Sequence, residues 1–275
     1  LLPGSGPIAG GTVVAVHGTN FASTNHLSCR FGSSFAHATW VSFASILCVA
    51  PPHPAGAVHL QVSMDGQTYT IHAEFVYLMP LKVDHLSPAN GPRSGGTNVV
   101  VHGENFGLTR ELKCRFGDIT VLAYRVSDTQ VNCTAPQHTS GLVTVEVTEN
   151  GVDWSNSDRT FLYQDAVTVD SVQPAVIPSG EPVSFRIVGN NFLPGTGCAL
   201  GNLTASYTTW ISANEIVCDF ADGVSNTADG GVRVTSNAQD YTESSGQLKV
   251  AGLWTVTEIT PHAGPLVGGT LLSVI

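Results

Sequence analysis

The sequence predicts an all-β protein built from repeated two-layer sandwiches, and three observations carry this prediction. A glycine-rich phrase recurs about every 85 residues, the cysteines follow the same period, and only 12% of the 275 residues are charged. Repetition at a fixed period means that one structural unit is copied along the chain. Few charges together with 29 glycines and 15 prolines are typical of turn-rich β-domains.

The repeated phrase is clearest over residues 91–106, which read GPRSGGTNVVVHGENF. Proline and glycine favour tight turns, so we expect a sharp chain reversal from Gly91-Pro92 to Gly95-Gly96. The β-branched run that follows predicts a strand, which Gly103 should end. Phe106 should then return an aromatic ring to the core. The phrase therefore predicts a turn, a strand, a second turn and an aromatic side chain that anchors the second turn to the core.

Copies of this phrase define the expected domains. Residues 6–21 carry it 85 positions upstream, residues 189–192 repeat its end, and residues 264–270 begin it once more. Units of this length are close to an immunoglobulin-like sandwich of roughly 100 residues. We expect sandwiches over residues 1–79 (with its first strand clipped), 80–165 and 166–251, and the start of a fourth copy over 252–275. Within the first unit, strands are expected near 12–17, 27–31, 37–43, 46–50, 57–63 and 72–77. A hairpin turn is expected at Asp65-Gly66, and Asn150-Gly151 occupies the same place in the second unit.

The six cysteines form one pair in each repeat, separated by 19 or 20 positions. These pairs are Cys29 with Cys48, Cys114 with Cys133, and Cys198 with Cys218. The chain has no Cys-x-x-Cys motif, so neither a zinc site nor a thioredoxin-like redox site is indicated. Buried free thiols are an alternative, but two cysteines per repeat kept in phase favour a disulfide inside each domain. Such bonds persist outside the cytosol, which predicts an extracellular or cell-surface protein.

The charge of the chain and the composition of its linkers indicate which partners it does not bind and how its domains are joined. A net charge of −10 without a basic run does not favour nucleic-acid binding, which depends on neutralising phosphates. No apolar run of eighteen residues is present, so we expect no membrane insertion in this segment. The joins near residues 77–83 and 163–169 contain no Gly/Ser-rich or Pro-rich spacer. Domains joined so closely should touch and form a stiff rod.

Four short phrases together resemble the IPT/TIG domain, an immunoglobulin-like sandwich found in tandem in plexin and hepatocyte-growth-factor-receptor ectodomains. They are Gly-Pro-x-x-Gly-Gly-Thr, Gly-x-Asn-Phe, Cys-x-Phe-Gly and Cys-x-Ala-Pro. The resemblance covers nearly the whole chain and is weaker over 174–250, where Cys198-Ala199-Leu200-Gly201 replaces the third phrase. It implies a stalk, spacer or protein-binding module without catalytic residues. A related domain of Rel-type transcription factors binds DNA, but the acidity and paired cysteines argue against that use.

Other candidate site residues are explained by the repeat itself. His17 and His102 share one repeat position and His53 and His138 share another, so they do not converge on one site. No arrangement for nucleophilic catalysis is visible. Asp84, Asp165 and Asp170 lie near the joins, but calcium loops require a multi-oxygen pattern that is missing around them. We predict no catalytic residue, no metal and no cofactor.

Two sequons are candidate N-glycosylation sites, at Asn132 and Asn202. Asn132 precedes a cysteine expected in a disulfide and is expected on a strand, whereas Asn202 follows a glycine in a turn region. Asn202 is therefore the better candidate, although either sequon can stay unused. The many serines and threonines also allow O-linked glycans.

These features suggest three functions. The first is a non-enzymatic structural protein, the repeating unit of a surface fibre, appendage or matrix filament, with self-association as its main interaction. The second is the stalk or ligand-binding segment of a receptor or adhesin that binds another surface protein. The third is an accessory module of a secreted carbohydrate-active enzyme. Because residues 259–275 replay residues 1–17, we expect a window from a longer repeat array; strand addition by another molecule is the alternative.

Overall fold

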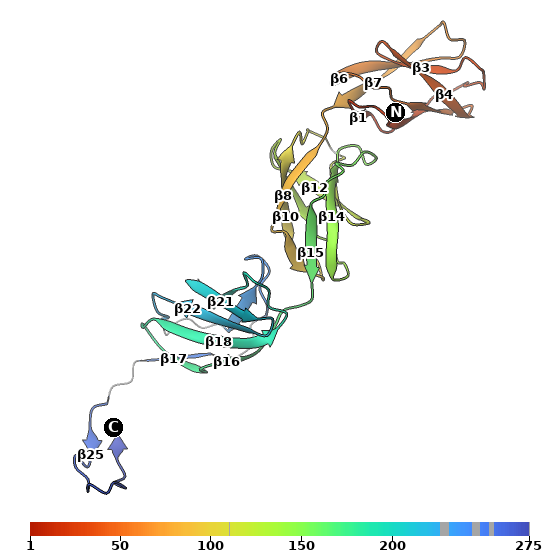
Figure 1. Ribbon diagram of the computed structural model, residues 1–275. Helices are drawn as coiled ribbons and strands as arrows, with labels where there is room; N and C mark the ends of the chain where they lie inside the picture. The colour runs from red at the N-terminus through yellow and green to blue at the C-terminus, as the bar shows by residue number, and fades with distance from the viewer. Residues whose placement is uncertain (110, 226–230, 244–247, 253–255, 275) are drawn as a thin grey trace. The chain divides into compact units, whose positions relative to one another are not determined.

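The computed structural model describes residues 1–109, 111–225, 231–243, 248–252 and 256–274 (Figure 1). They form two compact units, Leu1–Gln164 and Asp165–Ile275. Every secondary-structure element assigned within the described residues is a β-strand. The first unit holds two sandwiches and the second holds one, so the predicted all-β, immunoglobulin-like class is confirmed.

The first sandwich consists of β1 (Ser5–Pro7), β2 (Val13–His17), β3 (Ser28–Phe31), β4 (Ser34–Ser42), β5 (Ser45–Val49), β6 (Gly56–Ser63) and β7 (Thr70–Leu78). Their order is β1-β7-β6-β3-β4-β5-β2, and β4 belongs to both layers. Its first half pairs with β3 and its second half with β5. Alternate residues of β2 and β3, such as Val14 and Phe31, are fully buried because side chains alternate across a strand.

The second sandwich repeats this plan and adds one strand. It consists of β8 (Lys82–Ser87), β9 (Asn90–Pro92), β10 (Asn98–Glu104), β11 (Lys113–Phe116), β12 (Ile119–Arg125), β13 (Gln130–Thr134), β14 (Gly141–Thr148) and β15 (Thr160–Gln164). The added strand, β8, pairs antiparallel with β10, as the ribbon in Figure 1 shows. In the first sandwich only the bridge between Leu2 and Ala15 takes the place of that pairing.

The second unit contains the third sandwich and a terminal hairpin. The sandwich consists of β16 (Thr168–Gln173), β17 (Val176–Pro178), β18 (Val183–Asn190), β19 (Gly197–Leu200), β20 (Leu203–Thr204), β21 (Tyr207–Ser212), β22 (Glu215–Phe220), β23 (Val232–Thr235) and β24 (Lys249–Ala251). The hairpin pairs β25 (Ile259–Thr260) with β26 (Ser273–Val274). Its Thr260–Ser273 pair has the same sequence separation as the Ser87–Val100 pair of the second sandwich.

The predicted reversal between Gly91-Pro92 and Gly95-Gly96 is present, but it begins only at Pro92. Gly91-Pro92 end β9, a short strand parallel to β15, and Gly6-Pro7 likewise end β1 beside β7. A Cβ on Gly91 would lie 2.2 Å from Thr97 Oγ1 and 2.9 Å from the Phe161 ring, so the glycine admits close packing. The proline is tolerated because β9 is an edge strand. The turn itself has Arg93 and Ser94 at its centre and is closed by a hydrogen bond from the Gly95 amide to the Pro92 carbonyl at 2.9 Å. Gly95 and Gly96 follow it with positive φ angles.

The Gly-x-Asn-Phe phrase also differs from expectation. Gly103 does not end its strand: β10 continues to Glu104, with a bulge between His102 and Gly103. A Cβ on Gly103 would lie 1.9 Å from the Lys82 carbonyl oxygen and 2.8 Å from the Phe106 ring. The glycine therefore lets β8 and the anchoring ring approach β10 together. Phe106 is buried, as predicted.

Two equivalent tyrosines close the sandwiches, and they differ in one hydrogen bond. The Tyr77 hydroxyl donates to the Pro51 carbonyl at 2.8 Å, whereas the buried Tyr163 hydroxyl has no partner among the described residues. Burial raises the pKa of both phenols to about 12. Each hydroxyl is therefore neutral at physiological pH. Only the Tyr77 hydroxyl recovers, through its hydrogen bond, part of the free energy lost when it is removed from water.

Tyr77→Phe should lower the stability of the first sandwich by about 1 kcal/mol, the net value of one hydrogen bond. Tyr163→Phe should leave the second sandwich unchanged or slightly more stable, because it removes a desolvated hydroxyl that gains nothing. Hydrogen exchange of β7 and β15 measures each sandwich separately. Equal losses in both variants would contradict the difference between the two sites.

Candidate functional site: the junction of the first two sandwiches

Each sandwich contains one disulfide, and in the first two sandwiches it spans a strand that pairs with both cysteine strands. The bonds join Cys29 to Cys48, Cys114 to Cys133, and Cys198 to Cys218. In the first sandwich the two cysteines pair with Ala36 and Ala38, on the two halves of β4. The bond therefore ties the two layers together where β4 passes from one to the other.

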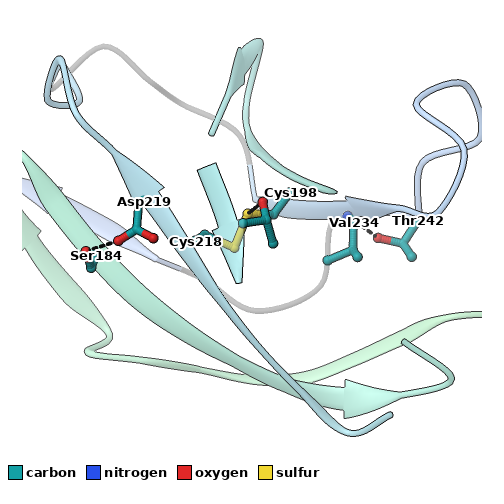
Figure 2. Close-up of a disulfide and its surroundings, with 7 residues drawn as sticks. Ser184, Cys198, Cys218, Asp219, Val234 and Thr242 are labelled. Carbon is teal, nitrogen blue, oxygen red and sulfur yellow. Dashed lines mark hydrogen bonds between the residues drawn. A yellow bond between two sulfur atoms is a disulfide. The ribbon is translucent and has the colours of Figure 1, made fainter. Parts of the chain in front are cut away.

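Figure 2 shows the third disulfide among the strands around it. Cys198 lies on β19 and Cys218 lies on β22, which belong to different sheets. The sheet of Cys218 also contains Ser184 and Asp219, whose side chains form a hydrogen bond. The Val234 amide donates to Thr242 Oγ1 at 3.1 Å. The weaker third repeat thus keeps the same covalent link between its layers.

One hairpin turn recurs in all three sandwiches and is held by its first side chain. Asp65 accepts from the amides two and three residues ahead, and so do Asn150 and Asn237. This is the local bonding by which Asp and Asn favour turns. The structure thus bears out a turn at both Asp65-Gly66 and Asn150-Gly151.

In the second sandwich this turn also contacts the first sandwich. Asn150 Nδ2 donates to the Ser5 carbonyl at 2.8 Å and to Asp153 Oδ2 at 2.7 Å. Thr12 Oγ1 donates to the same Asp153 oxygen at 2.8 Å. Thr12 is almost fully buried. We call this set, Ser5 and Thr12 with Asn150 and Asp153, the junction contact.

A cavity of about 230 Å³ lies beside the junction contact. Its apolar part comes from Pro7, the Leu78–Leu81 segment and Trp154, and its polar part includes Glu149. Glu149 is 5% exposed and accepts a hydrogen bond from the Gly107 amide. Burial raises the pKa of its carboxyl group, an effect partly offset by the Gly107 hydrogen bond and the charge of Arg125.

The segment between the two sandwiches is short and anchored. Three residues separate β7 from β8, and Asn105 Nδ2 donates to the Pro80 carbonyl at 2.8 Å. Asn105 adopts a left-handed φ of 68°, which asparagine tolerates better than most residues. In the second unit Asn191 makes the same bond to the Ala166 carbonyl. The asparagine of Gly-x-Asn-Phe therefore holds the segment that enters its own sandwich.

An arginine covers the aromatic residue that follows each turn, a feature that sequence reasoning missed. Arg30 lies 4.6 Å from the Tyr69 ring, Arg115 lies 4.3 Å from that of Trp154, and Arg233 lies 5.0 Å from that of Tyr241. The first two arginines stand in β3 and β11. The third stands on β23, opposite Ala199, which occupies their position on β19. The shared Cys-Arg-Phe of the first two repeats was the available signal.

The candidate histidines and aspartates stand on different strands and loops. His53 stacks on Tyr77 and His138 on Tyr163, at 4.8 and 5.0 Å. His17 lies on β2 and His102 on β10. Asp84 pairs with Lys82, Asp170 accepts from Asn190, and Asp165 also has an interaction partner. Within the described ranges no group of three or more His, Cys, Asp and Glu side chains gathers.

The two sequons lie in different settings. Asn132 stands in β13 between Val100 and Tyr124, and its Oδ1 is buried. Asn202 lies in the exposed turn between β19 and β20. Only Asn202 projects from a turn that a glycan can occupy without opening a sheet.

We expect a glycan at Asn202 and none at Asn132 when the protein is secreted from a eukaryotic host. Enzymatic removal of N-glycans in heavy-oxygen water converts an occupied asparagine to a labelled aspartate, which peptide mass spectrometry detects. Asn202→Gln should abolish the label. A label at Asn132 in folded protein would contradict the expectation, because the side chain lies within a paired strand.

The described residues contain no helix that is long and apolar enough to span a membrane. The architecture is that of immunoglobulin-like β-sandwiches in tandem. The model of the IPT/TIG domain family matches residues 1–77 and 81–163, and the chain belongs to this family. Its disulfides persist in oxidising compartments, and with this membership they place the segment in an extracellular or cell-surface region.

Curated relatives are much longer proteins. Mouse fibrocystin-L is 26% identical over 286 residues, covering 99% of this chain and 6% of its own length. Human plexin-A2 is 28% identical over 176 residues, covering 60% of this chain and 9% of its own length. The chain thus spans less than a tenth of these relatives. The solved full extracellular region of plexin A4 matches 96% of this chain and 26% of that one, at 17% identity and a TM-score of 0.46.

Proposed function

We propose that this chain is a non-enzymatic segment of the extracellular part of a cell-surface receptor or adhesin, which spaces and orients other parts of that protein. Family membership and the similarity to plexin-A2 support this reading. The observation that carries it is the junction contact, because a spacer that orients its neighbours needs modules fixed to one another.

Three features of residues 1–164 support a fixed orientation. The connecting segment has only three residues, and Asn105 restrains its carbonyl group. Asn150 and Asp153 then bind backbone and side-chain groups of the first sandwich. Contacts between modules joined by a flexible linker are usually loose, so a short linker and specific hydrogen bonds together favour a defined geometry.

The sequence also predicts other roles for this chain. They are assembly into a fibre by self-association, binding of another surface protein, N- and O-linked glycans, and an accessory role in a carbohydrate-active enzyme. The division at residues 79/80, 165/166 and 251/252 is likewise kept as a proposal, with residues 252–275 as the start of a further repeat.

Asp153→Ala and Thr12→Val should each loosen the first sandwich from the second, since each removes hydrogen bonds worth about 1 kcal/mol net. Residual dipolar couplings of the full chain measure this. One alignment tensor should fit strands β1–β15 of the native protein, and two should be needed for the variants. Asp240→Ala, which alters the equivalent turn of the third sandwich, should leave the fit of β1–β15 unchanged.

A single tensor for Asp153→Ala would show that the junction contact does not fix the orientation, and the spacer proposal would lose its main support. Sedimentation velocity distinguishes this spacer from a self-associating fibre. For the spacer we expect a monomer over a wide range of concentration. Filaments that grow with concentration would instead favour the fibre.

A further inference from the structure

Two histidines lie side by side on the outer face of the second sandwich. His85 of β8 and His102 of β10 are directly paired across the two strands. Their rings stack with centroids 4.2 Å apart and an angle of 5° between the planes. Because the backbone ladder sets this pairing, the two imidazoles stay close without help from a ligand. Neither residue belongs to the junction contact.

The surroundings leave the two rings available. His85 is exposed and His102 is half-buried. Gln130 of β13, which pairs with His102, places its Nε2 3.5 Å from His102 Nδ1. This weak contact holds the ring on one side only.

The charged side chains of the same two strands form ion pairs with one another. Lys82 Nζ lies 2.9 Å from Asp84 and 2.8 Å from Glu104. An imidazole binds a metal through the lone pair of an unprotonated ring nitrogen.

We propose that His85 and His102 together bind one divalent transition-metal ion, with water completing its coordination. Imidazole suits copper, nickel and zinc, and among divalent ions of this series copper binds most tightly. Two metal–nitrogen bonds of about 2.0–2.1 Å at a tetrahedral angle place their nitrogens about 3.3 Å apart. In the stacked arrangement the two rings are nearly parallel, so their in-plane lone pairs do not converge on one point. The exposed His85 ring must therefore swing out of the stack before two nitrogens can face one ion at this separation.

A titration of the metal-free full chain with copper(II), followed by electron paramagnetic resonance, tests this site. One equivalent should bind with hyperfine coupling to two nitrogens. His85→Asn and His102→Asn should each weaken this binding about a hundredfold, because the second imidazole binds intramolecularly at high effective concentration. The double variant measures binding by the remaining histidines.

His17→Asn is the matched control, because His17 occupies the equivalent exposed position on β2 and pairs with Ser45. It should bind copper as the native protein does. Hydrogen exchange of β8 and β10 shows whether each variant is folded. Coupling to a single nitrogen, or equal copper affinity in the native protein and His102→Asn, would overturn the proposal and leave the rings as a stacked pair.

Discussion

Removing the disulfide between Cys114 and Cys133 should lower the free energy of unfolding of the second sandwich by about 3 kcal/mol. The bond closes a loop with a sequence separation of 19 residues, so its loss frees the unfolded chain. It also links β11 and β13, which flank β12. Both cysteines are buried, so the paired change to alanine also leaves unfilled space in the core.

The measurement needs a probe of each sandwich, because a chain of several domains does not unfold in one step. Hydrogen exchange of β11, β13 and β14 should speed up strongly in Cys114→Ala/Cys133→Ala, while β16, β18 and β22 of the second unit serve as an internal reference. The result would count against the bond as the main link between layers if exchange in β11 and β13 stayed at its native rate.

Gly103→Ala should lower the free energy of unfolding of the second sandwich by a similar amount, about 3 kcal/mol. This is the upper end of the range for overpacked sites. The added methyl group would lie 1.9 Å from the Lys82 carbonyl oxygen and also meet the Phe106 ring. The carbonyl is part of the β8–β10 ladder, so it cannot move without breaking that pairing. The ring cannot move without leaving the core.

Urea unfolding followed by hydrogen exchange of β8 and β10 measures this loss. Gly4→Ala is the control, since a Cβ there meets nothing within 4 Å and its φ is not positive. We expect the control to change stability by less than about 0.5 kcal/mol, as for ordinary surface sites. Equal stability of the two variants would mean that β8 can retreat from Gly103 at little cost.

Most of the fold was predictable because the repeat displays the same alternation several times. The expected strands of the first sandwich near residues 12–17 and 57–63 correspond to β2 and β6. The strands β1 and β9 were missed because three residues ending in Gly-Pro carry no alternation and resemble a turn. Their pairing depends on a partner strand about seventy residues away, which local propensity does not report.

The candidate site was predictable only in part. Asn150-Gly151 indicated a hairpin turn, and the turn is there. Its use as a contact was not visible, because the partners Ser5 and Thr12 belong to the preceding sandwich. The pairing of His85 with His102 was missed for a related reason. His102 was compared with its repeat equivalent His17, and the strand register that brings His85 beside it is a property of the folded sheet.

The displaced arginine of the third sandwich has a consequence for how such repeats diverge. Arg115 and Arg233 reach the same kind of ring from two neighbouring strands, and the positions of these strands face each other in the ladder. Two arginines held at these facing positions at once would repel each other, so the gain of one is expected to accompany the loss of the other. An alignment by sequence alone would show two unrelated changes, although both arrangements place one arginine on an aromatic ring.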